Sequence, residues 1–404
     1  MGMFMNYLQN PVATAHNHLT HLLECLPEGL IDKEDVIRLS EVRQQWPAWP
    51  TPLLSNLVGP PSVILKNLDL RWLHRFETTV LLLNQMSRML GGPIGGPSGL
   101  SLIVERAPLL GHRGWGTTSA GGSCRLLEAL DETIAVNLPR EEDLLSVPAW
   151  LEQDYQDDIW ELIKQQVAKT PALELIERAE LLGMAVSAVG EAKNIENVIH
   201  GCNFDTRISA NPVVADLSSM WAGPLCGWFL SRSGAEVLKV ESSQRPDRGR
   251  VGRAPFYKRL NHGKKIIEVD FQSEKGVSRL RRIVREADIV IESSRPRALE
   301  SLGLFAEEEV QRGAIWCSIT GYGRERNPAR IGFGDDAAAA GNLLASVGDD
   351  LWFIGDAVAD PITGTTAAVL TQGLWLAGGS GFIDLSLSGS AHLHTLGKMP
   401  EGTI

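Results

Sequence analysis

The stretch PVVADLSSMWAGPLCGWFLSRSGAEVLKVE, residues 212–241, decides the fold of this chain. PVVADL is typical of a strand, LCGWFLSRSG of a helix and AEVLKVE of a second strand, so the three predict a β-α-β unit. Further strands are expected at KKIIEVDF, DIVIES and AIWCSIT, and SEKGVSRLRRIVREA predicts a helix that Ser273 caps. Strands that alternate with helices indicate an α/β fold with a mainly parallel, doubly wound sheet. The ligand site of such a sheet lies beyond the carboxyl ends of its strands.

The composition is that of a soluble globular protein. Hydrophobic residues make up 44% of the 404-residue chain and charged residues 22%, which excludes a disordered polypeptide. The formal net charge of −11 argues against general nucleic-acid binding. The N-terminus lacks the pattern of a signal peptide and no apolar run is long enough to cross a bilayer, so we expect a cytoplasmic protein without a membrane partner. The five cysteines are scattered without metal-ligand spacing, and no metal is expected.

Changes along the chain divide it into three segments. Residues 1–100 are expected to be mostly helical, and their pattern assigns them no role. Residues 101–200 contain a predicted strand at TIAVNL and two amphipathic helices within 160–183, followed by a linker. Residues 201–404 carry the alternating strands and helices of the larger unit.

The loops after the predicted strands are basic, although the chain is acidic overall. SSQRPDRGRVGR (242–253), YKRLNHGKK (257–265) and ESSRPR (292–297) all lie where the ligand edge of the sheet is expected. Such loops are often only solvated surface, but at this edge they also favour an anion with several phosphates. No GxGxxG fingerprint, P-loop or GxSxG elbow is present, which argues against a dinucleotide enzyme and a serine hydrolase.

Two carboxylates stand four residues apart in GDAVADPITGTTAAVL (355–370), at Asp356 and Asp360. Asp360 before Pro361 is typical of a helix N-cap, and capping is the simplest role for a carboxylate at this position. A carboxylate at a helix N-terminus near basic residues should also stay ionised at neutral pH and could attack an activated acyl group. The residues themselves leave both roles open.

Five motifs occur in order between residues 212 and 391: ADLSSMWAGPLCGWFLSRSGAEVLKVE, RLNHGKKIIEVDF, ADIVIESSRPRALESLGL, CSITGYG and DPITGTTAAVL. Together they resemble the class III coenzyme A transferases of the CaiB/BaiF type. This family includes formyl-CoA transferase, carnitine CoA-transferase and α-methylacyl-CoA racemase. The resemblance implies a Rossmann-like large domain, a smaller α+β domain and a homodimer whose two chains interlock.

The resemblance also implies a nucleophile. In the family it is an aspartate four residues before a glycine, and Asp360 with Gly364 occupies that place whereas Asp356 does not. The implied reaction moves coenzyme A from an acyl-CoA thioester to a free carboxylic acid, through an aspartyl mixed anhydride and an aspartyl-CoA thioester. Acyl-CoA and a small carboxylic acid would then be the substrates, with no tightly bound cofactor.

The resemblance and the basic loops together suggest where coenzyme A binds. The expected CoA contacts are Met220, Trp221, Ala222, Arg245, Arg248, Lys264, Val269, Ser293, Ser294, Arg295 and Arg330. Candidate auxiliary acids or bases are Asp335, Asp336 and Asp356. The order of units departs from the family, because the segment similar to the small domain precedes the Rossmann-like half.

Three other functions stay open. A racemase or isomerase of acyl-CoA esters would use Asp335, Asp336 and Asp360, although the racemases of the family have a histidine where this chain has GFGD (332–335). A catalytically inactive CoA-binding homologue would use Asp360 only as a helix cap. A nicotinamide-dependent dehydrogenase is the weakest alternative, since its glycine fingerprint is missing.

Overall fold

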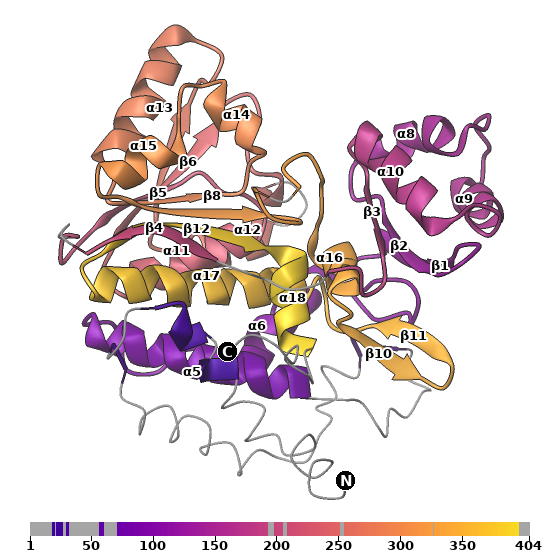
Figure 1. The fold of residues 1–404 in the computed structure, drawn as a ribbon, viewed down its shortest axis with the longest axis horizontal. Coiled ribbons are helices and arrows are strands. Elements are labelled where there is room, and N and C mark those ends of the chain that lie inside the picture. Colours follow the sequence, from indigo (N-terminus) through magenta and orange to yellow (C-terminus); the bar gives the residue numbers. More distant parts are fainter. Residues whose placement is uncertain are drawn as a thin grey trace, which may run out of the picture.

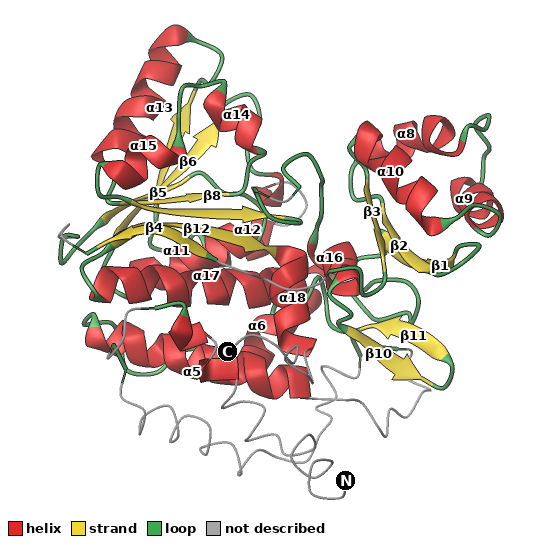
Figure 2. Ribbon diagram, in the orientation of Figure 1, coloured by secondary structure: helices red, strands yellow, loops and turns green. Residues whose placement is uncertain are grey.

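The structure is a computed structural model that describes residues 18–20, 22–26, 30–31, 56–59, 71–192, 198–204, 208–250, 254–325 and 327–395. These residues form a large α/β unit around a seven-stranded sheet and a lobe around a three-stranded sheet (Figure 1). Figure 2 shows helices on both faces of the large sheet. The predicted α/β class with a mainly parallel large sheet is confirmed.

The large sheet has the strand order β4-β12-β9-β8-β5-β6-β7. Its strands are β4 (Ile199–Asn203), β5 (Val213–Asp216), β6 (Glu236–Ser242), β7 (Lys265–Val269), β8 (Ile289–Glu292), β9 (Ile315–Thr320) and β12 (Ser380–Ser386). The edge strand β4 is antiparallel to β12, and the other strand pairs are parallel. From β5 the chain builds outward first through β6 and β7 and then, on the other side, through β8 and β9. This reversal places the expected ligand crevice at the carboxyl ends of β5 and β8.

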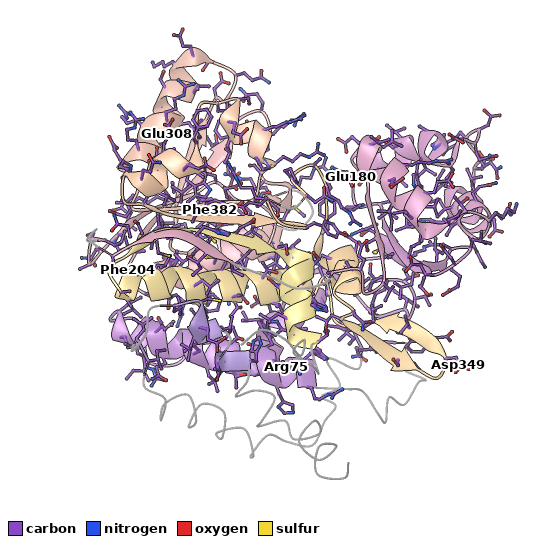
Figure 3. The ribbon with its side chains drawn as sticks, in the orientation of Figure 1. Arg75, Glu180, Phe204, Glu308, Asp349 and Phe382 are labelled. Atoms are coloured by element: carbon purple, nitrogen blue, oxygen red, sulfur yellow. The ribbon has the colours of Figure 1, made fainter. Side chains whose placement is uncertain are left out.

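Alternating side chains of the sheet build two separate cores. Val214 and Ile289 point to one face and pack into a cluster with α11, α17 and α5, whereas Ala215 and Val290 point to the other face and pack with α13, α14 and α15. The helices concerned are α5 (Arg71–Met89), α11 (Ala222–Arg232), α13 (Glu274–Glu286), α14 (Pro296–Glu300), α15 (Ala306–Gln311) and α17 (Ala359–Leu376). The layers can be followed in Figure 3 from Glu308 on α15, through Phe382 in the sheet, to Arg75 on α5.

Helix α5 gives the N-terminal segment a place in the large unit. Its apolar face, which includes Trp72, Phe76 and Leu83, is buried in the same cluster as α17, and α5 lies beyond α17 as seen from the sheet (Figure 1). Most of the predicted helical segment 1–100 lies outside the described residues. The described part of this segment includes α5 and the first residues of the short helix α6 (Gly99–Val104).

The two predicted helix caps have opposite outcomes. The Oγ of Ser273 accepts a hydrogen bond from the N–H of Gly276 at 3.1 Å, which confirms this residue as the cap of α13. Asp360 as an N-cap is wrong, because α17 begins at Ala359 and Val358 stands at its N-cap without a side-chain bond. The carboxylate of Asp360 instead lies near the backbone N–H of Ala222 in the neighbouring helix α11.

The lobe consists of an antiparallel sheet covered by three helices. Its elements are β1 (Cys124–Glu128), β2 (Thr133–Asn137), α8 (Glu141–Leu151), α9 (Ile159–Val167), α10 (Ala172–Leu182) and β3 (Ala185–Ala188). The strand predicted at TIAVNL and the two helices predicted within 160–183 are confirmed. Val136, Trp150 and Leu175 belong to a core of the lobe's own. Figure 3 places Glu180 of α10 on this lobe.

Helix α16 (Gly334–Ala340) joins the lobe to the large unit. The Oγ of Ser187 in β3 donates to the carbonyl oxygen of Asp336 at 3.0 Å, and the Nδ2 of Asn137 in β2 donates to the Asp336 carboxylate at 2.7 Å. A hairpin of β10 (Leu344–Val347) and β11 (Asp350–Phe353) follows α16. These contacts hold the lobe beside the carboxyl ends of the parallel strands.

Candidate active site

A cavity lies at the carboxyl ends of the parallel strands, between the large unit and the lobe. Ser219, Ser293 and Thr320 reach it from the ends of β5, β8 and β9, whereas Ser123 and Asn137 reach it from the lobe. The cavity volume is about 180 Å³. A crevice at the point where the strand order reverses is where open α/β sheets bind their ligands.

Asp360 lies in the first turn of α17 and lines this cavity. The backbone N–H of Ala222, at the start of α11, lies near its carboxylate and opposes the rise of its pKa. Gly364, one turn further along α17, allows this approach, because a Cβ atom there would overlap the carbonyl oxygen of Ala222. Gly334 clears the opposite side, where a Cβ atom would overlap the Asp360 carboxylate itself. Two glycines therefore make the room that this carboxylate occupies.

The carboxyl group of Asp360 has its pKa near neutral pH. Burial raises its pKa to about 7; the guanidinium of Arg106 opposes this rise and the carboxylate of Asp335 adds to it. The expectation that this carboxylate stays ionised at neutral pH is therefore wrong, because a pKa near 7 leaves about half of the groups protonated at pH 7. Since the group is partly removed from water, its ionised form is more basic, which favours nucleophilic attack once the proton has left.

Asp356, the other carboxylate of the motif, is buried and holds two basic side chains. One oxygen accepts from the Nε of Arg106 at 2.8 Å and from the Nδ1 of His112 at 3.0 Å, and the second oxygen also accepts from Arg106. Burial alone would raise the pKa of Asp356, but the ion pair with Arg106 holds it below its ordinary range. Asp356 is fully buried and does not line the cavity, whereas Arg106 and His112 do.

Asp335 stabilises the turn between the two aspartates. It lines the cavity and accepts a hydrogen bond from the backbone N–H of Ala357 at 2.9 Å. Ala357 has a φ of +49°, a left-handed conformation that costs a residue with a side chain about 1–2 kcal/mol. Burial and the nearby Asp356 raise the pKa of Asp335 to about 6. Strained backbone of this kind gathers at functional sites, and Met220, another cavity residue, also has a positive φ of 71°.

Asp336 faces the lobe and is not part of the cavity lining. Its Oδ1 accepts from the Nδ2 of Asn137 at 2.7 Å and from the N–H of Phe333 at 3.0 Å. Its Oδ2 is buried without a hydrogen-bond partner among the described residues. Burial raises the pKa of Asp336 to about 7, so near neutral pH this side chain can carry the proton that removes its charge.

The expected CoA loop reaches the cavity. Met220, Trp221, Ala222 and Ser293 all line it. The backbone N–H of Met220 donates to the carboxylate of Asp247 at 3.1 Å, which holds the loop between β5 and α11 in its left-handed turn.

The other expected CoA contacts lie outside the cavity lining. Lys264 is buried and its Nζ donates to Asp216 at 2.8 Å, and Val269 is buried in the core behind the sheet. Arg330 bonds to Glu191 and to the carbonyl oxygen of Val186. The remaining four are at or near the surface: Arg245, Arg248, Ser294 and Arg295.

Several cavity residues from the first half of the chain escaped sequence inspection. Arg106 opens the short helix α7 (Arg106–Leu110), and His112 follows in the next turn. GHRG (111–114), with a histidine beside a glycine, is the one local signal for His112. Nothing local marks Arg106, because its partner Asp356 is 250 residues away in the chain.

Two further observations concern metals and membranes. Within the described part of the chain, no group of three His, Cys, Asp or Glu side chains is arranged to hold a metal ion. None of the helices described there is long and apolar enough to cross a membrane.

Comparison with known proteins identifies one family. Residues 210–379 match the family model of CoA-transferase family III. Over 170 residues the chain is 34% identical to the succinyl-CoA–D-citramalate CoA-transferase of Chloroflexus aurantiacus, covering 39% of this chain and 42% of that protein. It is 33% identical over 147 residues to the human succinyl-CoA:glutarate CoA-transferase, covering 34% of each chain. The chain thus spans less than half of the length of these relatives.

Among solved structures, a CaiB/BaiF family protein from Brucella suis aligns with a TM-score of 0.42 and 30% sequence identity. The alignment covers 46% of this chain and 55% of that one.

Proposed function

Residues 210–379 belong to CoA-transferase family III, and on this premise we propose that the protein moves coenzyme A from an acyl-CoA thioester to a small free carboxylic acid. The observation that carries the proposal is the position of Asp360, a carboxylate with a raised pKa that lines a cavity at the ligand edge of the sheet. The relatives named above carry citramalate or glutarate in their names, which supports a small carboxylic acid as the acceptor.

In the first half of the proposed reaction, a carboxylate oxygen of Asp360 attacks the carbonyl carbon of the acyl-CoA thioester. The new C–O bond forms as the C–S bond breaks, and the electron pair leaves with sulfur as CoA thiolate. The thiolate then attacks Cγ of Asp360, and the donor acid leaves as a carboxylate. Asp360 now holds coenzyme A as a thioester, and no net proton or electron has been consumed.

In the second half, a carboxylate oxygen of the acceptor acid attacks Cγ of the Asp360 thioester and displaces CoA thiolate. The thiolate then attacks the acyl carbonyl carbon of the acceptor, which restores the Asp360 carboxylate and releases acceptor-CoA. Each attack at Cγ places negative charge on an Asp360 oxygen. The Ala222 N–H, which lies near this carboxylate, is the donor that would stabilise that charge.

We place the thioester end of coenzyme A against Met220, Trp221 and Ser293, because these residues line the cavity beside Asp360. Arg245 and Arg248 lie outside the cavity with their side chains exposed to solvent, where they could bind the phosphates of coenzyme A. The pair between Arg248 and Glu142, at 3.2 Å, is exposed on both sides and therefore weak enough to be exchanged for a phosphate. The proposal includes the interlocked homodimer of the family, which light scattering of the purified protein would test.

A second candidate function is proton exchange at the α-carbon of an acyl-CoA ester. Asp335 and Asp360 both line the cavity, and burial raises their pKa values to about 6 and about 7, where one can be protonated while the other is ionised. Entry of solvent deuterium at the α-carbon without exchange of coenzyme A would select this function.

Trapping of the intermediate tests the proposed transfer. The protein is incubated with a panel of acyl-CoA esters and quenched with hydroxylamine, which converts an aspartyl anhydride or thioester into a hydroxamate, and its peptides are mapped by mass spectrometry. We expect a hydroxamate on Asp360, none in Asp360→Asn, and an unchanged yield in Asp349→Asn, whose side chain is exposed in the β10–β11 turn (Figure 3). A hydroxamate on Asp335 or Asp356 in place of Asp360 would contradict the assigned nucleophile.

A further inference from the structure

Arg106, His112 and Asp356 form a buried cluster that the family match does not include as a whole. Arg106 and His112 precede residues 210–379, whereas Asp356 lies within them. Asp356 accepts two hydrogen bonds from Arg106 and one from His112, so a single carboxylate fixes both basic side chains. The guanidinium also lies over the ring of Trp221 at 4.5 Å from its centre. A bidentate ion pair with an aromatic support is a rigid arrangement.

The cluster presents unused hydrogen-bond donors beside Asp360. Arg106 uses its Nε and Nη2 on Asp356, and among the described residues its Nη1 has no partner. His112 uses its Nδ1 on Asp356, and its Nε2 is likewise without a partner in the described part of the chain. Neither nitrogen is a fully buried atom, and both side chains line the cavity that also contains Asp360. A group that bonds to both nitrogens would therefore lie next to the nucleophile.

Three other polar side chains of the cavity are already engaged. The Nδ2 of Asn137 donates to Asp336, the hydroxyl of Ser123 donates to Asn137 at 2.9 Å, and the hydroxyl of Tyr257 donates to Glu241. The wall also has the hydroxyl groups of Ser219, Ser293 and Thr320 and a set of apolar side chains: Met220, Trp221, Phe256, Ile319, Phe333 and Leu387. Of the described residues that line the cavity, Arg106 and His112 are the basic ones.

We propose that Arg106 and His112 bind the carboxylate of the acceptor acid, and that this acid is a short-chain monocarboxylate. The assignment rests on the proposed transfer reaction, in which the acceptor carboxylate must reach Cγ of Asp360. Nη1 of Arg106 donates to one acceptor oxygen, and Nε2 of His112 donates beside it when the ring carries both protons, with Nδ1 held by Asp356. The second acceptor oxygen stays free to attack: its bond to Cγ forms as the bond from Cγ to sulfur breaks, and the electron pair leaves with coenzyme A.

Size and charge together define the acid. The cavity volume of about 180 Å³ is at the low end for ligand sites, which favours a short acid. The second carboxylate of a dicarboxylate would have no basic partner in the described cavity, because Arg106 and His112 are the basic side chains of its lining. A short aliphatic chain, by contrast, is stabilised by Phe256, Ile319 and Leu387.

A binding titration that needs no turnover tests this subsite. Carboxyl-labelled butyrate and, separately, glutarate are titrated into the full-length protein, and their dissociation constants are measured by NMR. The test variants are His112→Leu and the double variant Arg106→Gln with Asp356→Asn, which removes both charges of the buried pair at once. Because Arg106→Gln alone would leave Asp356 buried and unpaired, it would test folding more than binding. The matched controls are His262→Leu and Arg113→Gln, whose side chains are exposed.

We expect butyrate to bind more tightly than glutarate. The dissociation constant of butyrate should rise roughly 10- to 100-fold in both test variants, the loss expected for a charge-assisted hydrogen bond, and should not change in the controls. In the transfer assay His112→Leu should raise the KM of the acceptor and leave the trapping of Asp360 unchanged. Unchanged butyrate binding in His112→Leu and in the double variant, or tighter binding of glutarate than of butyrate, would overturn the subsite.

The two proposals can fail separately. Butyrate binding that depends on His112, in a protein whose Asp360 is never trapped by any donor, would retain the acid site and refute the transfer reaction. If Asp360 is trapped but the variants of Arg106 and His112 bind the acid as tightly as the unchanged protein, the transfer is retained and the acid site is refuted.

Discussion

Replacing Gly364 by alanine should separate the stability of the fold from the reactivity of Asp360. A Cβ at this position would overlap the carbonyl oxygen of Ala222, and α17 and α11 would have to move apart by about 0.6 Å to restore a separation of 3.0 Å. Overpacking of this kind lowers the free energy of unfolding by about 1–3 kcal/mol. The same shift moves Asp360 away from the Ala222 N–H, and a displacement approaching 1 Å lowers the rate of a positioned reaction by about 10²-fold.

Gly373→Ala on the same helix is the matched control. Its Cβ would collide with the side chain of Leu26, about three and a half turns away from Asp360, so it disturbs the packing of α17 without touching the cavity. Chemical denaturation should show a loss of stability in both variants. The initial rate of hydroxamate formation on Asp360 should fall only in Gly364→Ala. Equal trapping rates in the two variants would refute the idea that the contact between Gly364 and Ala222 positions the nucleophile.

Three further predictions follow from buried charges. The trapping rate at Asp360 should rise with pH through about 7 and then level off, because only the ionised carboxylate attacks; a rate that does not change between pH 6 and pH 8 would contradict this. Burial raises the pKa of Asp336 to about 7, so its ionisation lowers the free energy of unfolding as the pH rises from about 4 through 7. Urea unfolding of Asp336→Asn should therefore show a free energy of unfolding that is about 1–3 kcal/mol higher than that of the unchanged protein at pH 8 and equal to it at pH 4. Lys264→Ala should lower the free energy of unfolding by about 3–5 kcal/mol, because it leaves Asp216 buried without its closest partner. A Lys264→Ala variant of native stability that binds acyl-CoA more weakly would instead assign Lys264 to the CoA site.

Local patterns along the chain predicted the large sheet well. Each strand from β5 to β9 coincides with an apolar run quoted from the sequence, and Ser273 caps α13 as its position next to an amphipathic helix indicates. These features depend on neighbours within a few residues, which is the range over which periodicity and capping act. Local pattern also predicted that the motif around Asp360 lies at the junction of a loop and a helix.

Features that depend on distant partners were not predictable from local pattern. Asp360 lies near the Ala222 N–H of α11 in place of capping its own helix, and the cavity position of Arg106 depends on Asp356, 250 residues away. Lys264 sits in a basic loop that suggested a phosphate contact, yet the fold turns its side chain inward to Asp216. In each case a buried hydrogen bond or ion pair decides the direction of the side chain, and sequence spacing carries no information about it.

The place of α5 in the fold has a consequence for the synthesis of the protein. The apolar face of α5, with Trp72, Phe76 and Leu83, is covered by α17, which begins 270 residues after α5 ends. At 5–20 residues per second, a ribosome needs roughly 15 to 55 s to make that intervening chain. Throughout this time the helix has left the ribosome but lacks the surface that will cover it. A nascent chain of this design therefore depends on chaperones that bind apolar helices, and slowing translation before α17 should increase its aggregation.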